Sequence, residues 1–420
     1  MIKILYILEA TSGGTQKHVI DVAKKIDKSE FQIDIVYSTN RNKNFVQEST
    51  GIFNKMFGLP ITRSGSPSDI INILKIRKII KENNYDIVHC HSTKAGFVGR
   101  LATFISRHPN VVYSPHGFMF CDTRIKLRRL LYLNLEKYLG YLTNKVIAVS
   151  GSEKDLALQH NIVPNKKIIT LYNSIDPSDF DDYNYINKVP DKLRQDESEI
   201  ILGTVGRLYY QKDPITLIKS FKIVNDRFPN TKLIIVGDGP LEGACIRLIK
   251  QLGLDKKIEL AGYQKNSKSY YKKFDIFILS SHYEGLPYAL LEAMSMGIPS
   301  IGTDVVGIKD LILHGKTGYL AKEGDYQGLA DMVIKLLDSP ELLSVFSENA
   351  KTITRANFNF NDGIKNMKNF ILHNVYGLHK ENLSIKLTIV NNFTYLTDHK
   401  YFYITFSLLQ YSFNNGVTLL

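Results

Sequence analysis

Residues 280–304 read SSHYEGLPYALLEAMSMGIPSIGTD and directly follow an apolar, β-branched run that ends at Leu279. The run predicts a buried strand, and the segment from about Pro287 to Met296 predicts an apolar helix. A Glu-Gly-Leu-Pro turn joins the two, and proline suits the first turn of a helix, where its missing N–H costs nothing. Strand, turn and helix in this order indicate one unit of an α/β fold.

The same alternation of apolar strand, polar or glycine-rich turn and helical segment repeats on both sides of this stretch. It predicts parallel sheets and therefore a doubly wound α/β architecture. In the N-terminal half, the predicted strands are 2–8, 31–38, 86–90, 111–115, 145–150 and 167–171, and the predicted helices are 16–26, 68–83, 94–106 and 124–142. The alternation restarts at Ile200 with the strand IILGTVG and continues through Leu337.

The alternation fails between these two series, where Asp, Asn, Pro and Tyr are frequent, and this segment predicts a linker. Two doubly wound domains bind ligands at the carboxyl ends of their strands. We expect a first Rossmann-like domain over residues 1–173, a linker over 174–198, a second Rossmann-like domain over 199–358, a helix that crosses back to the first domain over 359–379, and a tail without assignment over 380–420.

Composition favours a globular protein without membrane-spanning helices. With 420 residues, 44% of them hydrophobic, the chain can bury two or three cores. No run approaches the roughly 18 apolar residues of a membrane-spanning helix, and no cleavage site follows the N-terminus. We therefore expect a cytoplasmic enzyme, with peripheral attachment to the inner face of the plasma membrane as an open alternative.

The cysteines and histidines do not favour a metal site. Cys90, Cys121 and Cys245 form no CxxC pair, which argues against a disulfide framework or a zinc knuckle. His89 and His91 would share one face of a strand end, but no further ligand cluster lies near them in the sequence. A metal is the weaker interpretation of this pair.

The formal charge of +12 raises the hypothesis of nucleic-acid binding. Between His91 and Leu135, however, seven basic residues stand against one acid, so half of the net charge lies in one segment. Such a patch suits an anionic surface or a diphosphate-bearing acceptor, and no nucleic-acid partner is expected. Residues 118–142 predict either a helix on an anionic membrane surface or a helix packed into the first domain. The basic residues at the start of that segment are Arg124, Lys126, Arg128 and Arg129.

Two glutamates, Glu284 and Glu292, give the opening stretch its chemistry. The helix that starts near Pro287 would direct its N-terminal amides, including those of Leu286, Tyr288 and Ala289, at a phosphate or another anion. Glu292 would lie about one and a half turns into the helix, where it could accept hydrogen bonds from hydroxyl groups.

Glu284, seven residues and Glu292 resemble the signature of the retaining glycosyltransferase family 4, whose GT-B fold has two Rossmann-like domains facing each other across a cleft. GRLYYQKDP at residues 206–214 resembles that family's GRL-then-Lys element. The resemblance implies that Arg207 and Lys212 neutralise the donor diphosphate and stabilise the leaving nucleotide. A pair of exposed surface cations is the alternative.

The resemblance also assigns residues to the donor. Glu292 would bind the ribose, Glu284 the transferred sugar, and Tyr263 would neighbour the base. His116, in SPHGF, would face the donor sugar, and Asn173 begins a segment similar to the family's NGID element, with serine in place of glycine. The remaining donor-binding residues implied by the resemblance are Gly13, Gly14, Gly285, Leu286, Tyr288 and Ala289. A bare glycine turn is an equal alternative for the pair at 13 and 14.

Family resemblance implies transfer of a sugar with retention of configuration from a nucleotide-diphosphate sugar, without a metal or other cofactor. We expect a UDP-sugar, although guanine and adenine donors stay open. The segments HSTKAGFVGRLA and YSPHGFMF resemble bacterial transferases that extend polyprenyl-diphosphate-linked glycans for capsule, O-antigen or exopolysaccharide. The predicted acceptor is therefore a lipid-linked glycan.

Two other functions compete with this one. A protein that binds nucleotide sugars without catalysis would keep the same fold. A nicotinamide oxidoreductase would need a dinucleotide fingerprint, and the nearest candidate, residues 237–243, has its third glycine one residue late and a proline inside the loop.

Overall fold

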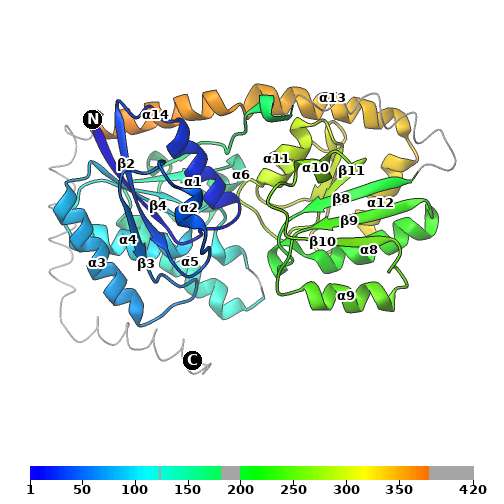
Figure 1. Cartoon of the computed structure of the whole chain (residues 1–420), viewed down its shortest axis with the longest axis horizontal. Coiled ribbons are helices and arrows are strands. Elements are labelled where there is room, and N and C mark those ends of the chain that lie inside the picture. The colour runs from blue at the N-terminus through cyan, green and yellow to red at the C-terminus, as the bar shows by residue number, and fades with distance from the viewer. Residues whose placement is uncertain (123, 181–198, 378–420) are drawn as a thin grey trace. The chain divides into compact units, whose positions relative to one another are not determined.

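The computed structural model describes residues 1–122, 124–180 and 199–377 (Figure 1). Within these residues the strands form two sheets, in the orders β3-β2-β1-β4-β5-β6-β7 and β10-β9-β8-β11-β12-β13. Contacts between Cα atoms divide the chain into two compact units. Among the described residues, unit 1 comprises Met1–Ser114, Leu139–Val146 and those from Ile364 onwards, and unit 2 comprises those of Pro115–Tyr138 and Ile147–Gly363. The predicted α/β architecture with two sheets is confirmed.

The seven-stranded sheet is built from apolar strands whose side chains are mostly buried on both faces. Such continuous apolar runs are typical of parallel strands that helices cover on both sides. Ile4 of β1 pairs in parallel with Ile33 of β2 and with Ile87 of β4. The strand order reverses direction at β1 and β4, so a switch point lies at their carboxyl ends. The strands are β1 (Ile2–Leu8), β2 (Phe31–Ser38), β3 (Met56–Leu59), β4 (Ile87–His91), β5 (Val111–Ser114), β6 (Lys145–Ala148) and β7 (Ile168–Thr170).

The sequence missed one strand of this sheet. β3 is a four-residue edge strand that pairs with β2 through Ile35 and Met56, and it contains Gly58, which weakens any strand pattern. The helices agree better, and the predicted helix 68–83 has the bounds of α3. The helices between these strands are α1 (Gly14–Lys25), α2 (Phe45–Glu48), α3 (Ser68–Asn83), α4 (Thr93–Ile105), α5 (Lys126–Tyr141) and α6 (Gly151–Gln159).

The six-stranded sheet repeats the same winding. β8 pairs with β9 on one side and with β11 on the other, so its switch point lies at the carboxyl ends of β8 and β11. The strands are β8 (Ile200–Val205), β9 (Thr231–Val236), β10 (Ile258–Gly262), β11 (Ile276–Leu279), β12 (Ser300–Thr303) and β13 (Gly318–Ala321). The helices are α8 (Pro214–Arg227), α9 (Glu242–Gln251), α10 (Lys268–Tyr271), α11 (Tyr288–Ser295) and α12 (Tyr326–Leu337).

Two long helices, α13 (Pro340–Asn357) and α14 (Phe360–Gly377), end the described chain (Figure 1). α14 matches the helix predicted after residue 358, and in unit 1 its Lys368 Nζ lies 2.6 Å from Oε1 of Glu30. Among the described residues, no helix is both long and apolar enough to cross a membrane. Most of the predicted linker and the predicted tail lie outside the described residues.

Candidate active site

The segment that follows β11 forms a buried turn that leads into α11. This helix begins at Tyr288, directly after Pro287, close to the predicted start. Both Leu286 and Tyr288 are buried. The side-chain amide of Asn173 donates to the carbonyl oxygen of Leu286 at 2.9 Å. The turn is therefore fixed by the segment that resembles the NGID element.

Glu284 lies at the centre of a hydrogen-bonded group at the carboxyl ends of β8 and β11. Its Oε1 atom lies 2.5 Å from Nζ of Lys212 and accepts a hydrogen bond from the hydroxyl of Ser281 at 2.6 Å. Gln211 donates to the other carboxylate oxygen at 3.4 Å. Because Glu284 is only 7% exposed, its charge needs these partners. The structure thus brings together two predicted catalytic residues, Lys212 and Glu284.

The loop between β8 and α8 holds Lys212 directly before a capped helix. Asp213 has a φ of 44°, and its side chain accepts a hydrogen bond from the backbone N–H of Thr216 at 3.1 Å, which caps α8. At the start of the loop, Leu208 lies so close to Gly239 that a Cβ atom there would be 2.4 Å from the Leu208 carbonyl oxygen. This glycine belongs to the 237–243 segment, which departs from a dinucleotide fingerprint, and it makes room for the GRL loop.

Arg207 occupies the carboxyl end of β8 and is exposed. Its guanidinium carbon lies 5.8 Å from the centre of the Tyr209 ring. The family resemblance requires a cation at this end of the sheet, and Arg207 is an exposed cation there. Its role toward a diphosphate stays a prediction.

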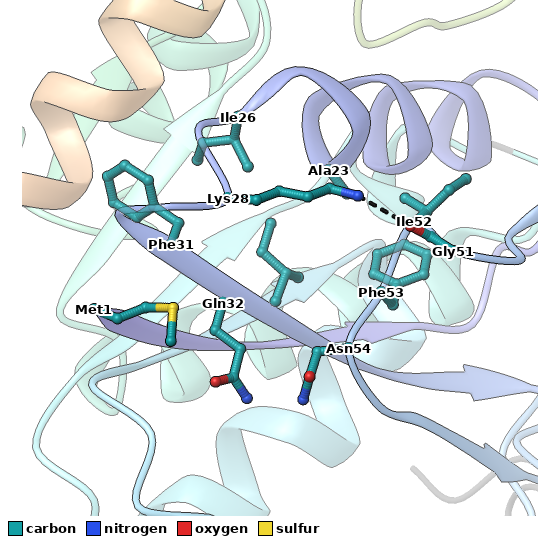
Figure 2. A pocket seen from close by; sticks show the side chains of 11 residues that line it. Met1, Ala23, Ile26, Lys28, Phe31, Gln32, Gly51, Ile52, Phe53 and Asn54 are labelled. Carbon is teal, nitrogen blue, oxygen red and sulfur yellow. Dashed lines mark hydrogen bonds between the residues drawn. The ribbon is translucent and has the colours of Figure 1, made fainter.

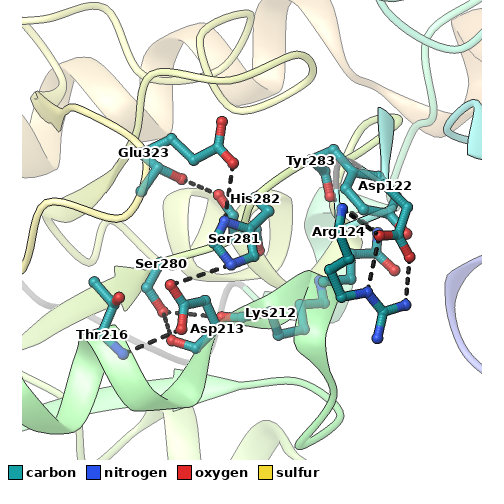
Figure 3. Close-up of polar contacts among 12 residues, drawn as sticks. Asp122, Arg124, Lys212, Asp213, Thr216, Ser280, Ser281, His282, Tyr283 and Glu323 are labelled. Atoms are coloured by element: carbon teal, nitrogen blue, oxygen red, sulfur yellow. Dashed lines mark hydrogen bonds and ion pairs between the residues drawn. The ribbon is translucent and has the colours of Figure 1, made fainter. Parts of the chain in front are cut away.

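His282 is a site residue that the sequence did not indicate. Its Nδ1 atom lies 2.9 Å from Oε1 of Glu323, and its Nε2 atom lies 3.4 Å from Oδ2 of Asp213 (Figure 3). The ring stacks on Tyr210 at 4.3 Å between centroids. His282 therefore joins the turn after β11 to the loop after β8. His282 lies between the predicted strand that ends at Leu279 and the predicted helix that starts near Pro287, and this position was the available signal in the sequence. The contacts of its ring are formed with residues far apart in the sequence.

Arg124 is also engaged in this region. Its guanidinium pairs with Asp122 (Figure 3). The guanidinium carbon lies 4.3 Å from the centre of the Tyr210 ring. Burial raises the pKa of Asp122, but the hydrogen bonds and charge of Arg124 outweigh it and hold that pKa below its usual range. The predicted helix from residue 124 is corrected here, because α5 begins at Lys126 and Arg124 lies before it.

His116 follows β5 in a strained conformation, with a φ of 53°, and Gly117 has a φ of 98°. A residue other than glycine rarely adopts a positive φ outside functional or turn positions. The backbone of these two residues packs against Gly285: a Cβ atom added to Gly285 would lie 2.8 Å from the carbonyl carbon of His116 and 2.9 Å from the nitrogen of Gly117. Within unit 2, the structure thus places the predicted His116 loop against the predicted Glu284 turn.

Glu292 lies in the second turn of α11 and is half-buried. The buried hydroxyl of Tyr271 donates to the carbonyl oxygen of Ala289 at 3.1 Å. Burial, followed by the charge and hydrogen bonding of Glu292, raises the pKa of Tyr271 well above its usual value, so the tyrosine stays neutral. Tyr263 follows β10 and is 70% exposed, so its ring is available to a ligand, and its role as neighbour of the base stays a prediction.

Unit 1 contains the predicted glycine loop and the histidine pair. Gly13 has a φ of 80° and precedes α1, which begins at Gly14, so the conformation itself favours glycine. His89 and His91 lie on one face of β4, as predicted, with ring centroids 4.0 Å apart. The Nε2 atom of His89 lies 2.9 Å from the hydroxyl of Ser114. Burial and then the neighbouring His18 lower the pKa of His89 to about 3, so its ring is neutral at physiological pH.

A separate pocket in unit 1 lies at the amino ends of strands in the first sheet, opposite to their carboxyl ends (Figure 2). It is lined by residues at the amino ends of β1 and β2, including Met1, Phe31 and Gln32. Lys28 donates to the carbonyl oxygen of Gly51 at 3.0 Å beside it (Figure 2). Ligands of doubly wound sheets bind at the carboxyl ends, so this pocket does not coincide with the candidate active site.

Comparison with known proteins agrees with this geometry. Residues 12–179 match the family profile described as Glycosyltransferase Family 4, and residues 186–353 match the one described as Glycosyl transferases group 1. Over 308 residues the chain is 28% identical to the UDP-Gal:alpha-D-GlcNAc-diphosphoundecaprenol alpha-1,3-galactosyltransferase of Escherichia coli, covering 72% of this chain and 79% of the relative. Over 295 residues it is 32% identical to the N-acetyl-alpha-D-glucosaminyl L-malate synthase of Bacillus anthracis, covering 68% and 74%. Among solved structures, Anabaena HepE in complex with UDP and glucose matches with a TM-score of 0.72 at 21% identity, covering 88% of this chain and 99% of that one.

Fold and site together define a glycosyltransferase of the GT-B fold. The predicted class of enzyme is confirmed, and the nicotinamide oxidoreductase alternative is wrong. The chain belongs to glycosyltransferase family 4.

Proposed function

We propose that this enzyme transfers a hexose from a UDP-sugar to a polyprenyl-diphosphate-linked glycan, with retention of configuration, in the synthesis of a bacterial surface polysaccharide. The contact between Lys212 and Glu284 carries the proposal, because it sets a cation beside a carboxylate at a switch point. The named functions of the Escherichia coli galactosyltransferase and of a capsular glycosyltransferase from Staphylococcus aureus, 26% identical over 347 residues, support this acceptor class.

In the proposed reaction Lys212 and Arg207 neutralise the diphosphate as the bond to the sugar breaks. Fixed positive charge is most effective where negative charge develops in the transition state, so these two cations replace a metal ion in the proposal. Glu284 accepts hydrogen bonds from hydroxyls of the transferred sugar, and Glu292 accepts them from the ribose. Gly285 lets the backbone after Glu284 approach the donor, since it bears no side chain.

The identity of the base, proposed to be uracil, is the most detailed part of the donor assignment. HepE was solved with UDP and with UDP-glucose, which supports a UDP-sugar here by similarity of fold. Tyr263, exposed after β10, is the residue proposed to face the base.

The enzyme is proposed to act at a membrane surface. Beside the basic residues Lys126, Arg128 and Arg129, three apolar side chains are exposed: Ile125 at 50%, Leu127 at 53% and Leu130 at 54%. Exposed apolar side chains among cations suit an anionic lipid surface. Because Arg124 is held by Asp122, the other three cations carry this interaction in the proposal. The acceptor's lipid would be presented at the inner face of the plasma membrane.

A thermal-shift screen tests the donor. UDP, GDP, ADP, their common sugar conjugates and NAD are compared without added metal, because a ligand that binds only the folded protein raises its melting temperature. We expect stabilisation by UDP and one UDP-sugar, lost in Glu292→Ala and retained in Glu341→Ala on α13. Stabilisation by GDP or ADP instead would refute the base assignment, and no response to any nucleotide sugar would refute the proposed donor.

A further inference from the structure

Glu153 is a fully buried carboxylate in unit 2 to which the proposed reaction gives no role. It is the third residue of α6, and the hydroxyl of Ser150 caps that helix by accepting from the backbone N–H of Glu153 at 3.1 Å. In an ordinary capping box the glutamate side chain would return to the N–H of the cap residue. Here one carboxylate oxygen accepts from the N–H of Val149 at 2.7 Å, and the other accepts from the N–H of Gly117 at 2.6 Å.

The second hydrogen bond reaches the loop that carries His116. Gly117 and His116 both have positive φ angles, which are unfavourable for a histidine and persist only where neighbouring groups impose them. The same two residues are in backbone contact with Gly285, directly after Glu284. One buried carboxylate therefore fixes the strained peptide that packs against the sugar-binding turn.

We propose that Glu153 is a positioning residue for sugar transfer, which holds the His116–Gly117 peptide against the Glu284–Gly285 backbone. It acts through the loop and not on the donor, because its side chain is buried. The inference rests on the proposed function, since only there do His116 and Glu284 face the transferred sugar.

The carboxylate form is the one that suits this role. Both oxygens accept from backbone N–H groups, whereas a protonated acid would direct its O–H toward a donor and lose one of the two bonds. Burial raises the pKa of Glu153 to about 7; the hydrogen bonds from Val149 and Gly117 oppose this shift, and the charges of Asp310 and Glu136 add to it. The thiol of Cys121 interacts electrostatically with Glu153, and burial raises the pKa of that thiol to about 12, so it stays neutral. Glu153 should therefore anchor the loop fully only above about pH 7.

Glu153→Gln tests the role, because glutamine keeps the shape but offers one acceptor oxygen. With the nucleotide sugar that stabilises the wild type, we expect kcat to fall about tenfold or more while KM for the donor changes less. In the wild type kcat should rise as the pH increases through about 7, and the variant should lack this step.

Asp275→Asn is the matched control. Asp275 is fully buried in the same unit and accepts from the N–H of Ile201 at 2.7 Å, but it directly precedes β11, at the amino end of the strand. A wild-type rate and pH profile in Glu153→Gln, or an equal loss in the control, would overturn the proposal.

Hydrogen exchange supplies a readout that does not depend on activity. In the wild-type protein, protection of peptides that span residues 115–118, corrected for the intrinsic effect of pH, should fall as the pH decreases from 8 to 6. Equal protection at both values would overturn the proposal even if Glu153→Gln did not fold. If protection changes as expected but no nucleotide sugar is used, the proposed function fails and the anchoring of the loop by Glu153 stands.

Discussion

Nζ of Lys212 lies 2.5 Å from Oε1 of Glu284, although 72 positions separate the two residues in the chain. The lysine follows β8 and the glutamate follows β11, and these strands are neighbours at the switch point of the second sheet. The pair holds a cation in place beside the carboxylate that is proposed to bind the sugar. A donor diphosphate would therefore meet a cation whose position is already fixed, which lowers the cost of organising the site.

Lys212→Ala should lower kcat by a factor of about 10² to 10³, because it removes a fixed charge from the developing negative charge of the leaving group. The fold should persist, since Ser281 and Gln211 still donate to Glu284. Initial rates and circular dichroism measure the two effects. Lys222→Ala is the control, as Lys222 pairs with Asp226 on the exposed side of α8. Near wild-type turnover in Lys212→Ala would refute the assigned role.

Gly285→Ala should destabilise unit 2 by about 1–3 kcal/mol and lower activity, because the new methyl group would meet the backbone of His116 and Gly117. Gly243→Ala, within α9, is the control: its nearest neighbour would be the Arg247 side chain at 3.6 Å, so stability should hold or rise slightly. Urea unfolding of both variants checks this. Equal stability of the two variants would contradict the close contact.

The free energy of global unfolding should depend on pH through Glu153, in the opposite sense to the anchoring of the loop, because unfolding exposes the carboxylate to water whereas opening of the loop removes only its hydrogen bond from Gly117. Its pKa is about 7 in the folded protein against an ordinary value of 4.5, so the folded state binds the proton more tightly. The wild type should therefore lose stability relative to Glu153→Gln as the pH rises from about 4.5 to about 7, by about 3 kcal/mol in all. Below this window both states are protonated, and above it both are ionised. Urea unfolding at pH 5 and pH 8 measures the difference, and parallel pH curves would contradict the assignment.

Leu127→Asp combined with Leu130→Asp should reduce binding to phosphatidylglycerol vesicles at least about tenfold, since two exposed leucines lose their place in the lipid interface. Added salt should weaken wild-type binding because the cations of α5 are screened. Co-sedimentation measures both effects. Val345→Asp, at an exposed apolar position on α13, should bind as the wild type does. Wild-type protein that stays in the supernatant with anionic vesicles would rule out the membrane surface.

Much of the fold could be predicted because its local signals agree. The apolar runs of β1 and β2 are long and buried on both faces, so their predicted bounds match the observed ones. β3 escaped prediction since four residues with a glycine carry too little pattern, and its pairing with β2 decides its conformation. α5 starts later than predicted because Arg124 binds Asp122 instead of entering the helix.

The site could be predicted only where a motif carries it. Glu284 and Lys212 were found by their resemblance to two motifs of glycosyltransferase family 4, and the structure brings them into contact. His282 was missed because its partners Asp213 and Glu323 are distant in the sequence. The Ser150 and Glu153 pair has the spacing of a capping box, and this local pattern gives no sign that the glutamate reaches Gly117. Contacts of this kind depend on tertiary packing, which no local pattern encodes.

The separation of Lys212 from Glu284 along the chain also constrains folding. Between them the chain must complete β9 and β10 and then return to place β11 beside β8. Long-range parallel pairings of this kind form slowly, because loop closure precedes the contacts that reward it. The ion pair cannot form in a chain that ends before residue 284. Because the pair also requires β11 to lie beside β8, recovery of donor binding during refolding would show when these two strands have paired.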